Sequence, residues 1–370
     1  MKGFRNNLLF FFMIGALIFI VIGCGSQEET ESTSGSNNND TADEEKVETG
    51  KDSEAEEDSN NDAEAENQET YTLKMASPSN PEDTMVQAFF HFEEMVEEES
   101  DGRIEVEVQH SGQLGGQSDY IDGLQLGSIQ AAEITTSVLS SLDDRMLIFD
   151  MPYLSESMEH QREVIQSGLG DELSNVMEEE ENIKIVGWLQ RSARNVYSSA
   201  GPIETPGDFE GLDIRVMESP VMTNTMELLG ANPTPIAADE RYMALQTGVV
   251  DAAENSIALV LTEKEYEVTD YVSMTQHFMT PNTIAMDQNF FESLPEDLQE
   301  IITNAGEEAG KFAYEEEQRQ VDEAVSELEE VGMEVNFIKD KSSFKEAVQP
   351  IYDEYEEEIG KEYFDYFDNN

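Results

Sequence analysis

Short apolar runs alternate with longer amphipathic runs from about residue 70 to the end of the chain. The short runs are rich in β-branched residues and are bounded by polar turn residues, as β-strands are. The pattern predicts strands at 71–76, 103–108, 129–134, 183–189, 212–217, 249–254, 282–286 and 333–338. Strands separated by helices favour an α/β fold with largely parallel sheets.

Two amphipathic runs have a clear helical period. Residues 82–100 place apolar side chains on one face, and Ser-Asp-Gly ends the run. Residues 294–332 predict a second helix with a proline in its first turn. This second helix is long for a globular protein, so a break near Gly306 or Gly310 is one expectation.

One phrase occurs twice in the chain. GLQLGSIQAAEIT (123–135) and ALQTGVVDAAENS (244–256) both contain Leu-Gln-x-Gly and, after three residues, Ala-Ala-Glu. Each copy is predicted to be a helix end, a glycine turn and a short strand. Two such units predict two similar lobes that share a cleft, because ligands of open α/β sheets bind at the carboxyl ends of strands. The alternative is chance convergence of two helix ends.

The N-terminus has the features of an export signal. Lys2 and Arg5 precede an apolar run, 8–22, that is short for a membrane-spanning helix. The run ends in Val-Ile-Gly-Cys, which resembles the lipobox of bacterial lipoproteins. Residues 1–23 are therefore predicted to be a signal peptide and Cys24 the acylated first residue of the mature chain; an uncleaved anchor is the alternative. Because Cys24 is the sole cysteine, the body has no disulfide.

Residues 24–69 are predicted to be an acidic disordered linker that tethers the body to the lipid anchor. The segment contains 17 acidic residues, two lysines and no aromatic residue. Such a composition cannot bury enough apolar surface to offset the entropy lost on ordering.

The charge, the histidine and cysteine content and the motifs of the chain exclude several classes of function. Asp and Glu number 82 against 20 Lys and Arg, for a formal net charge of -62, so we expect no nucleic-acid partner. The four histidines are scattered and the body lacks cysteine, so we expect no metal site. No Gly-x-Ser-x-Gly motif is present, and GQLGG (112–116) lacks the Lys-Ser/Thr of a phosphate loop. We therefore expect no enzymatic activity and no cofactor.

The few basic residues point to one region. A group of them lies between residues 184 and 241: Lys184, Arg191, Arg194, Arg215 and Arg241. Arg215 stands inside an apolar predicted strand, where a guanidinium is costly without a partner. Its planar fork matches a carboxylate, which could belong to a ligand or to an internal Glu or Asp.

Residues 209–256 resemble the solute-binding proteins of tripartite ATP-independent periplasmic (TRAP) transporters. Four further segments follow in the order typical of that family: 102–116, 124–133, 148–154 and 293–309. The resemblance implies an α/β, two-lobed periplasmic-binding-protein-like fold with a long helix near the C-terminus that spans both lobes. The lobes implied are 70–190 plus 281–325 for lobe I, and 191–280 plus 326–370 for lobe II.

The resemblance also implies a function. The protein would be a monomeric receptor, lipid-anchored on the extracytoplasmic face of the plasma membrane. It would capture a small organic acid, with a dicarboxylate favoured, and deliver it to the membrane subunits of a TRAP transporter. Presentation of the ligand to an extracytoplasmic sensor kinase and binding of a zwitterionic compatible solute are the alternatives.

Several ligand-binding residues follow from the resemblance. The family arginine that grips the ligand carboxylate corresponds to Arg215. A second arginine upstream corresponds to Arg194, with Arg191 as a competitor, and a ligand-binding asparagine corresponds to Asn255.

Three positions bear on how the part of the ligand beyond its carboxylate would be bound. Ala238 occupies a place where the family often has an aromatic residue, so stacking there is lost. Thr135 occupies a place where some members have a charged or amide residue, and it is a candidate ligand contact. Trp188, near the arginines, is a candidate contact as well as a candidate core residue.

Overall fold

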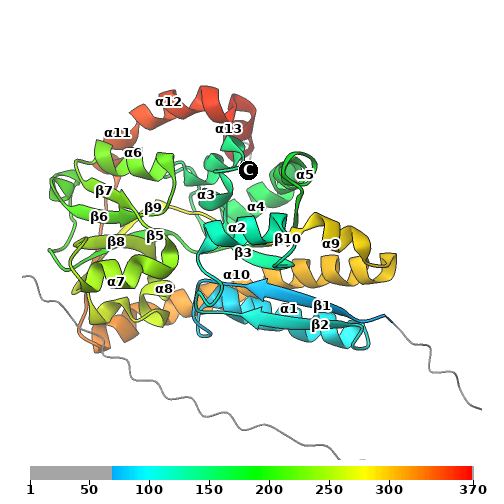
Figure 1. Ribbon diagram of the computed structural model, residues 1–370. Coiled ribbons are helices and arrows are strands. Elements are labelled where there is room, and N and C mark those ends of the chain that lie inside the picture. The colour runs from blue at the N-terminus through cyan, green and yellow to red at the C-terminus, as the bar shows by residue number, and fades with distance from the viewer. Residues whose placement is uncertain (1–68, 369–370) are drawn as a thin grey trace, which may run out of the picture. The chain divides into compact units, whose positions relative to one another are not determined.

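Two mixed β-sheets organise the computed structural model, which describes residues 69–368 (Figure 1). The first sheet has the strand order β2-β1-β3-β10-β4, and the second has the order β11-β9-β5-β8-β6-β7. The strands are β1 (Tyr71–Ala76), β2 (Ile104–Gln109), β3 (Ala131–Thr135), β4 (Ile183–Leu189), β5 (Arg194–Ser198), β6 (Asp213–Val216), β7 (Asn232–Pro235), β8 (Ala252–Ser256), β9 (Tyr271–Phe278), β10 (Asn282–Asp287) and β11 (Glu334–Phe337). We call the first sheet with its helices lobe I and the second lobe II.

Each sheet contains a strand that arrives from the other lobe. Strand β4 ends at Leu189 in lobe I and β5 begins at Arg194 in lobe II, while β9 ends at Phe278 and β10 begins at Asn282 back in lobe I. Both β5 and β10 run antiparallel to their two neighbours, and the other pairs are parallel. The sheets are thus mixed rather than largely parallel, because the arriving strands enter in the reverse direction.

Helices cover the faces of both sheets. They are α1 (Thr84–Glu99), α2 (Gln117–Gln125), α3 (Thr136–Leu139), α4 (Met158–Val164), α5 (Gly170–Glu181), α6 (Pro220–Leu228), α7 (Arg241–Gln246), α8 (Ile257–Thr262), α9 (Gln288–Ser293), α10 (Glu296–Glu330), α11 (Ser342–Val348), α12 (Pro350–Ile359) and α13 (Lys361–Asp368). Short helical turns are η1 (Asp144–Asp150), η2 (Ile165–Leu169), η3 (Pro206–Phe209), η4 (Ala238–Glu240) and η5 (Glu265–Glu267).

Helix α10 is unbroken over 35 residues and contacts both lobes. It packs on α1 and β4 of lobe I and on α8 and β11 of lobe II, and in Figure 1 it extends from one lobe to the other. The expected break at Gly306 or Gly310 is absent. A Cβ on Gly306 would lie 2.0 Å from the Val186 oxygen, and one on Gly310 would lie 2.7 Å from the Trp188 oxygen. The glycines therefore let α10 cover the edge strand β4, whose backbone would otherwise be open to pairing.

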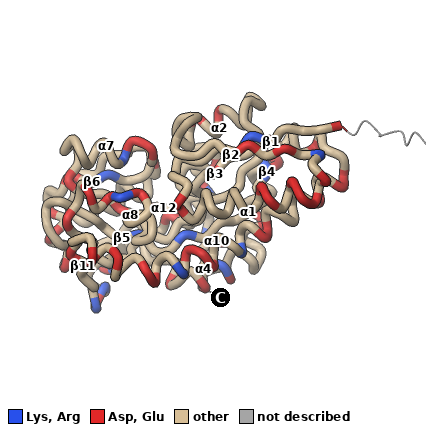
Figure 2. The backbone as a smooth tube through the Cα atoms, turned by 90° about the horizontal axis from the view of Figure 1, so that it is seen from below, with Lys and Arg blue, Asp and Glu red and all other residues tan. Residues whose placement is uncertain are grey.

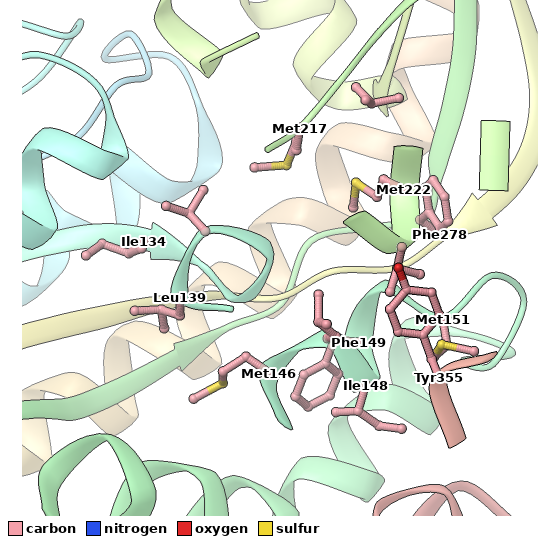
Figure 3. Close-up of a cluster of buried hydrophobic side chains, with 14 of the residues drawn as sticks. Ile134, Leu139, Met146, Ile148, Phe149, Met151, Met217, Met222, Phe278 and Tyr355 are labelled. Atoms are coloured by element: carbon pink, nitrogen blue, oxygen red, sulfur yellow. The ribbon is translucent and has the colours of Figure 1, made fainter. Parts of the chain in front are cut away.

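The C-terminal helices pass from lobe II to lobe I. Helix α11 contacts α6, α12 contacts both α6 and η1, and α13 contacts α4 and η2. A buried apolar cluster lies beneath them, in which Met151 and Tyr355 lie near Met222 and Phe278 (Figure 3). Apolar packing thus joins the lobes on this side. The exact division of the chain into lobe ranges stays a prediction.

Within residues 69–368, no helix is long and apolar enough to cross a membrane. The apolar run at 8–22, Cys24 and nearly all of the predicted linker lie outside the described residues. Acidic residues are spread over both lobes, whereas Lys and Arg occupy isolated positions (Figure 2).

Candidate functional site

The repeated phrase forms the same unit in each lobe. Helix α2 leads through Gly127 into β3, and α7 leads through Gly248 into β8. The two glycines have φ angles of 71° and 68°, which residues with a Cβ rarely adopt. The predicted helix-turn-strand units are therefore confirmed. Their glutamates are buried: Glu133 lies near Arg191, between β4 and β5, and Glu254 lies against Arg194, the first residue of β5.

Arg215 lies on β6 with 1% of its surface exposed. Its Nε donates a hydrogen bond to the oxygen of Ile236 at 2.7 Å, whereas its buried Nη1 and Nη2 have no hydrogen-bond partner among the described residues. Burial, together with the nearby charge of Arg241, lowers the pKa of Arg215 to about 10. A fixed guanidinium with two free donors is preorganised for a carboxylate.

Arg194 is held by Glu254. Its Nε donates to Oε2 of Glu254, and its Nη2 donates to Oε1 at 2.8 Å and to the main-chain oxygen at 2.9 Å. Its Nη1 donates to Oδ1 of Asn255 at 3.2 Å. Since a guanidinium has five N–H groups, Arg194 keeps one free for any other acceptor. Its role as a second ligand arginine stays a prediction.

Arg191 lies among three carboxylates. Its Nη1 and Nη2 donate to both oxygens of Asp83 at 3.0 and 2.8 Å, while oxygens of Glu133 and Glu317 lie 4.0 and 3.9 Å away. Burial and the charge of Asp83 raise the pKa of Glu133 to about 7. Glu317 also accepts hydrogen bonds from the main chain and hydroxyl of Ser192. Arg191 therefore ties the crossing between β4 and β5 to α1, β3 and α10.

Asn255 and Thr135 both lie at strand ends. Oδ1 of Asn255 accepts from the Ser256 nitrogen at 2.8 Å as well as from Arg194, and its amide nitrogen has no partner within residues 69–368. Thr135 donates from Oγ1 to Oδ1 of Asn282 at 2.6 Å. Asn255 therefore has a donor available for a ligand, whereas the Thr135 hydroxyl is engaged within lobe I.

Trp188 contacts residues of lobe I. Its Nε1 donates to Ser174 at 3.2 Å, and its ring lies 5.7 Å from that of Phe149. It lines a pocket of about 690 Å³ between α5, β4 and α10, which includes none of the arginines of lobe II. The structure thus does not bring Trp188 into the group around Arg215, and its role as a ligand contact stays a prediction.

A pocket of about 180 Å³ lies between the lobes. Lobe I contributes residues that follow β1 and β2, and lobe II contributes residues that follow β7 and residues that follow helix α8, so carboxyl ends of parallel strands face it from both sides. Its polar lining includes Ser79, Asn80, Ser111, Asp239, Arg241 and Glu263. Sequence reasoning missed most of these residues. Four of them, Ser79, Asn80, Ser111 and Asp239, come soon after a strand, and that position is the signal that could have found them.

The other titratable groups of the region are held internally. Arg241 donates from Nε to Glu265 at 2.7 Å. Burial lowers the pKa of His277 to about 4, so this imidazole is neutral near pH 7. In the part of the chain that the structure describes, no cluster of three or more His, Cys, Asp or Glu side chains is placed to hold a metal ion.

Comparisons with known proteins identify the family. The DctP family, bacterial extracellular solute-binding protein family 7, matches residues 75–358. A solute-binding protein of Sulfitobacter sp. strain NAS-14.1 is 33% identical over 290 residues, which cover 78% of this chain and 88% of that protein.

Solved structures agree with the sequence match. A TRAP periplasmic solute-binding protein from Roseobacter denitrificans with bound β-D-glucuronate has a TM-score of 0.77 and 26% identity, covering 81% of this chain and 99% of that one. One from Sulfurospirillum deleyianum with bound succinate has a TM-score of 0.78 and 25% identity, with the same coverage. This chain therefore belongs to the DctP family of TRAP extracytoplasmic solute-binding proteins, and it is a binding protein rather than an enzyme.

Proposed function

We propose that this protein captures a small organic acid by holding its carboxylate on Nη1 and Nη2 of Arg215. One observation carries the proposal: these two nitrogens are buried and unpartnered, whereas Arg191, Arg194 and Arg241 each have a carboxylate partner. Burial of an unpaired guanidinium is unfavourable, so a ligand that supplies the missing charge is bound strongly. The free amide nitrogen of Asn255 is a second donor for the same ligand.

The remainder of the ligand is proposed to be hydroxylated, as in a sugar acid. The pocket between the lobes offers acceptors from Asp239 and Glu263 and groups that both donate and accept from Ser79 and Ser111. Hydroxyl groups match such a lining. The relative from Roseobacter denitrificans with bound β-D-glucuronate supports this choice.

A C4-dicarboxylate is the second candidate, and it is the class that the sequence favours. The relative with bound succinate supports it, and Arg241 lines the pocket. The guanidinium of Arg241 is paired with Glu265, however, and Asp239 and Glu263 would repel a second carboxylate. We therefore rank it below a sugar acid.

We expect isothermal titration to give a Kd for D-glucuronate or D-galacturonate at least about tenfold lower than that for succinate. The physical reason is the acceptor-rich pocket, since one unfavourable charge contact of about 1.4 kcal/mol changes Kd tenfold. Tighter binding of succinate would contradict the sugar-acid assignment and favour the dicarboxylate. Failure of every organic acid with a net negative charge to bind would contradict the proposed function itself and leave a zwitterionic compatible solute as the alternative.

The bound acid is proposed to pass to the membrane subunits of a TRAP transporter from a monomeric, lipid-anchored receptor. Membership of the family supports the transport role, and the Val-Ile-Gly-Cys motif before the acidic linker supports the anchor. Genes for two multi-span membrane subunits beside this gene would agree with transport, whereas a neighbouring sensor-kinase gene would favour presentation to a kinase.

Replacing Cys24 with serine is expected to block acylation, because the thioether to the lipid needs a thiol. In a host that processes lipoproteins, the Cys24→Ser chain should be unprocessed or released into the medium, while the parent chain stays with the membrane. Lipid labelling and membrane fractionation measure this, and Ser26→Ala is the control outside the motif. Continued acylation of the Cys24→Ser chain would disprove the anchor.

A further inference from the structure

Asn80, which lines the pocket, connects the two lobes. It lies on the loop between β1 and α1 of lobe I, and its Nδ2 donates to the oxygen of Thr262 in lobe II at 2.8 Å. Its main-chain nitrogen donates to Oε1 of Glu263 at 2.8 Å. Thr262 is the last residue of α8, so Asn80 satisfies a carbonyl that has no partner inside that helix. We call these two hydrogen bonds the Asn80 latch.

Hydrogen bonds to the side chain and to the main chain of Asn80 fix the loop that carries it. Oδ1 of Asn80 accepts from the Glu82 nitrogen at 2.8 Å, which orients the amide so that Nδ2 faces lobe II. The main-chain oxygen of Asn80 accepts from the Asp83 nitrogen at 3.1 Å, and the Asp83 carboxylate holds Arg191 between β4 and β5. The latch is therefore linked by a short chain of contacts to the crossing between the lobes.

A second contact between the lobes lies beside the same pocket. The GQLGG turn of lobe I lies close to Asp239 of lobe II. A Cβ added to Gly116 would lie 3.0 Å from Oδ1 of Asp239, and a Cβ added to Gly112 would lie 3.3 Å from the Cβ of Asp239. Contacts on two sides of the pocket show that the lobes are closed on it in this structure. Because the latch joins residues of both lobes, separation of the lobes at the pocket would break it.

We propose that Asn80 is an affinity-determining residue that acts by stabilising the closed state rather than by touching the ligand. The proposal rests on the proposed function only in assuming that a ligand binds between the lobes. When binding requires the closed state, the measured Kd equals the intrinsic Kd divided by the fraction of closed molecules. Loss of the latch therefore weakens every ligand of the cleft by the same factor.

Glu263 contributes to the latch as an acceptor. It is half-buried, and burial together with the charge of Asp83 raises its pKa above the usual range of a glutamate. The groups facing it are Asn80 and Asp83 from lobe I and Arg241 and Glu265 from lobe II. A further negative charge at residue 80 would thus be placed among carboxylates and would drive the lobes apart.

Asn80→Asp is the sharpest variant for testing the latch. Aspartate keeps the acceptor that holds the Glu82 nitrogen, but it loses the donor to Thr262 and adds a charge next to Glu263. We expect the Kd of D-glucuronate to rise about 5- to 150-fold, and that of succinate to rise at least as much, because the new charge on the pocket lining also repels the second carboxylate. Asn80→Ala adds no charge and leaves the bond from the main chain to Glu263, so it should give a smaller rise that is the same factor for D-glucuronate and succinate. Asn289→Asp is the control, since it makes the same charge change within lobe I.

The distance between labels on the two lobes measures the population of the closed state without any ligand. Spin labels on Leu126→Cys and Val249→Cys, which are 83% and 62% exposed and each lie next to the turn glycine of one copy of the repeat, report on the separation of the lobes in a Cys24→Ser background. We expect a short-distance population that Asn80→Asp depletes and Asn289→Asp leaves unchanged. Thermal unfolding of the ligand-free variants should stay close to that of the parent chain.

Three results would overturn the latch: an unchanged Kd in Asn80→Asp, unequal factors for the two acids in Asn80→Ala, or a short-distance population that is absent or insensitive to residue 80. Unequal factors would mean that Asn80 contacts the ligand directly. If neither acid binds the parent chain, the proposed function fails, and the label distances in the ligand-free protein still decide on the latch.

Discussion

Replacing Arg215 with alanine is expected to raise the Kd of the bound acid by about 30- to 5,000-fold. A carboxylate that leaves water loses hydration worth several kcal/mol, and the two unpartnered nitrogens of Arg215 are the groups placed to replace it. Truncating one partner of a buried, hydrogen-bonded charge pair costs about 2 to 5 kcal/mol. Titration calorimetry with the acid that binds most tightly to the parent chain measures the effect.

Arg215→Lys separates the charge from the geometry. Lysine keeps a positive charge but loses the fork and the Nε bond to Ile236, so binding should again weaken severely. Ligand-free stability should change little in either variant, because Nη1 and Nη2 of Arg215 have no partner to lose among residues 69–368. Near-parental affinity in Arg215→Ala would remove the carboxylate grip from this residue and leave Arg194 or Arg191 as the candidate.

Arg194→Ala is a contrasting variant. It leaves the fully buried carboxylate of Glu254 without its bidentate partner, so we attribute any loss of binding in this variant first to damage within the fold. A lower melting temperature without ligand therefore distinguishes Arg194 from Arg215. This contrast follows from the different partners of the two guanidinium groups in the structure.

Sequence reasoning succeeded where local chemistry decides the structure. The glycines of the repeated phrase take positive φ angles that need no tertiary partner, and strand β4 is found at the predicted residues, 183–189. The two-lobed fold and the helix that spans it were predicted from the resemblance and are confirmed.

Three strands escaped prediction because their sequences lack the usual pattern. Strand β7 contains Pro233 and Pro235, which is possible because it is an edge strand and pairs only with β6. Strands β5 and β9 carry polar residues at buried positions, so no alternation of apolar and polar residues marks them. Pairing with neighbouring strands of lobe II, rather than local pattern, makes these segments strands.

Which arginines have a carboxylate partner could not be predicted from sequence. Arg194 and Glu254 are 60 residues apart in the chain, and the register that pairs Asn195 with Asn255 brings them together. Nothing near Arg215 in the sequence indicates that its terminal nitrogens lack such a partner. The free arginine is therefore a property of the folded sheet, and the same holds for the contacts of Asn80.

Replacing Gly306 with alanine is expected to destabilise the protein by about 3 kcal/mol and to lower its Tm by about 6 to 12 °C. In an exposed helix the same change would stabilise by about 1 kcal/mol, since alanine is the better helix former. Here the new Cβ would lie 2.0 Å from the main-chain oxygen of Val186, which belongs to a central part of β4 and cannot rotate away. Helix α10 would have to move off the strand. Differential scanning calorimetry measures the change.

Two further substitutions in α10 grade the effect by distance. Gly310→Ala should lower Tm less, because its Cβ would meet the Trp188 oxygen at 2.7 Å, and Glu315→Ala on the exposed face should leave Tm nearly unchanged. The order of Tm values should thus follow the distance between the added methyl group and β4. An unchanged or higher Tm for Gly306→Ala would mean that α10 does not touch β4 in solution. Since α10 also holds Ser192 through Glu317, a helix displaced by Gly306→Ala should loosen the crossing between the lobes as well.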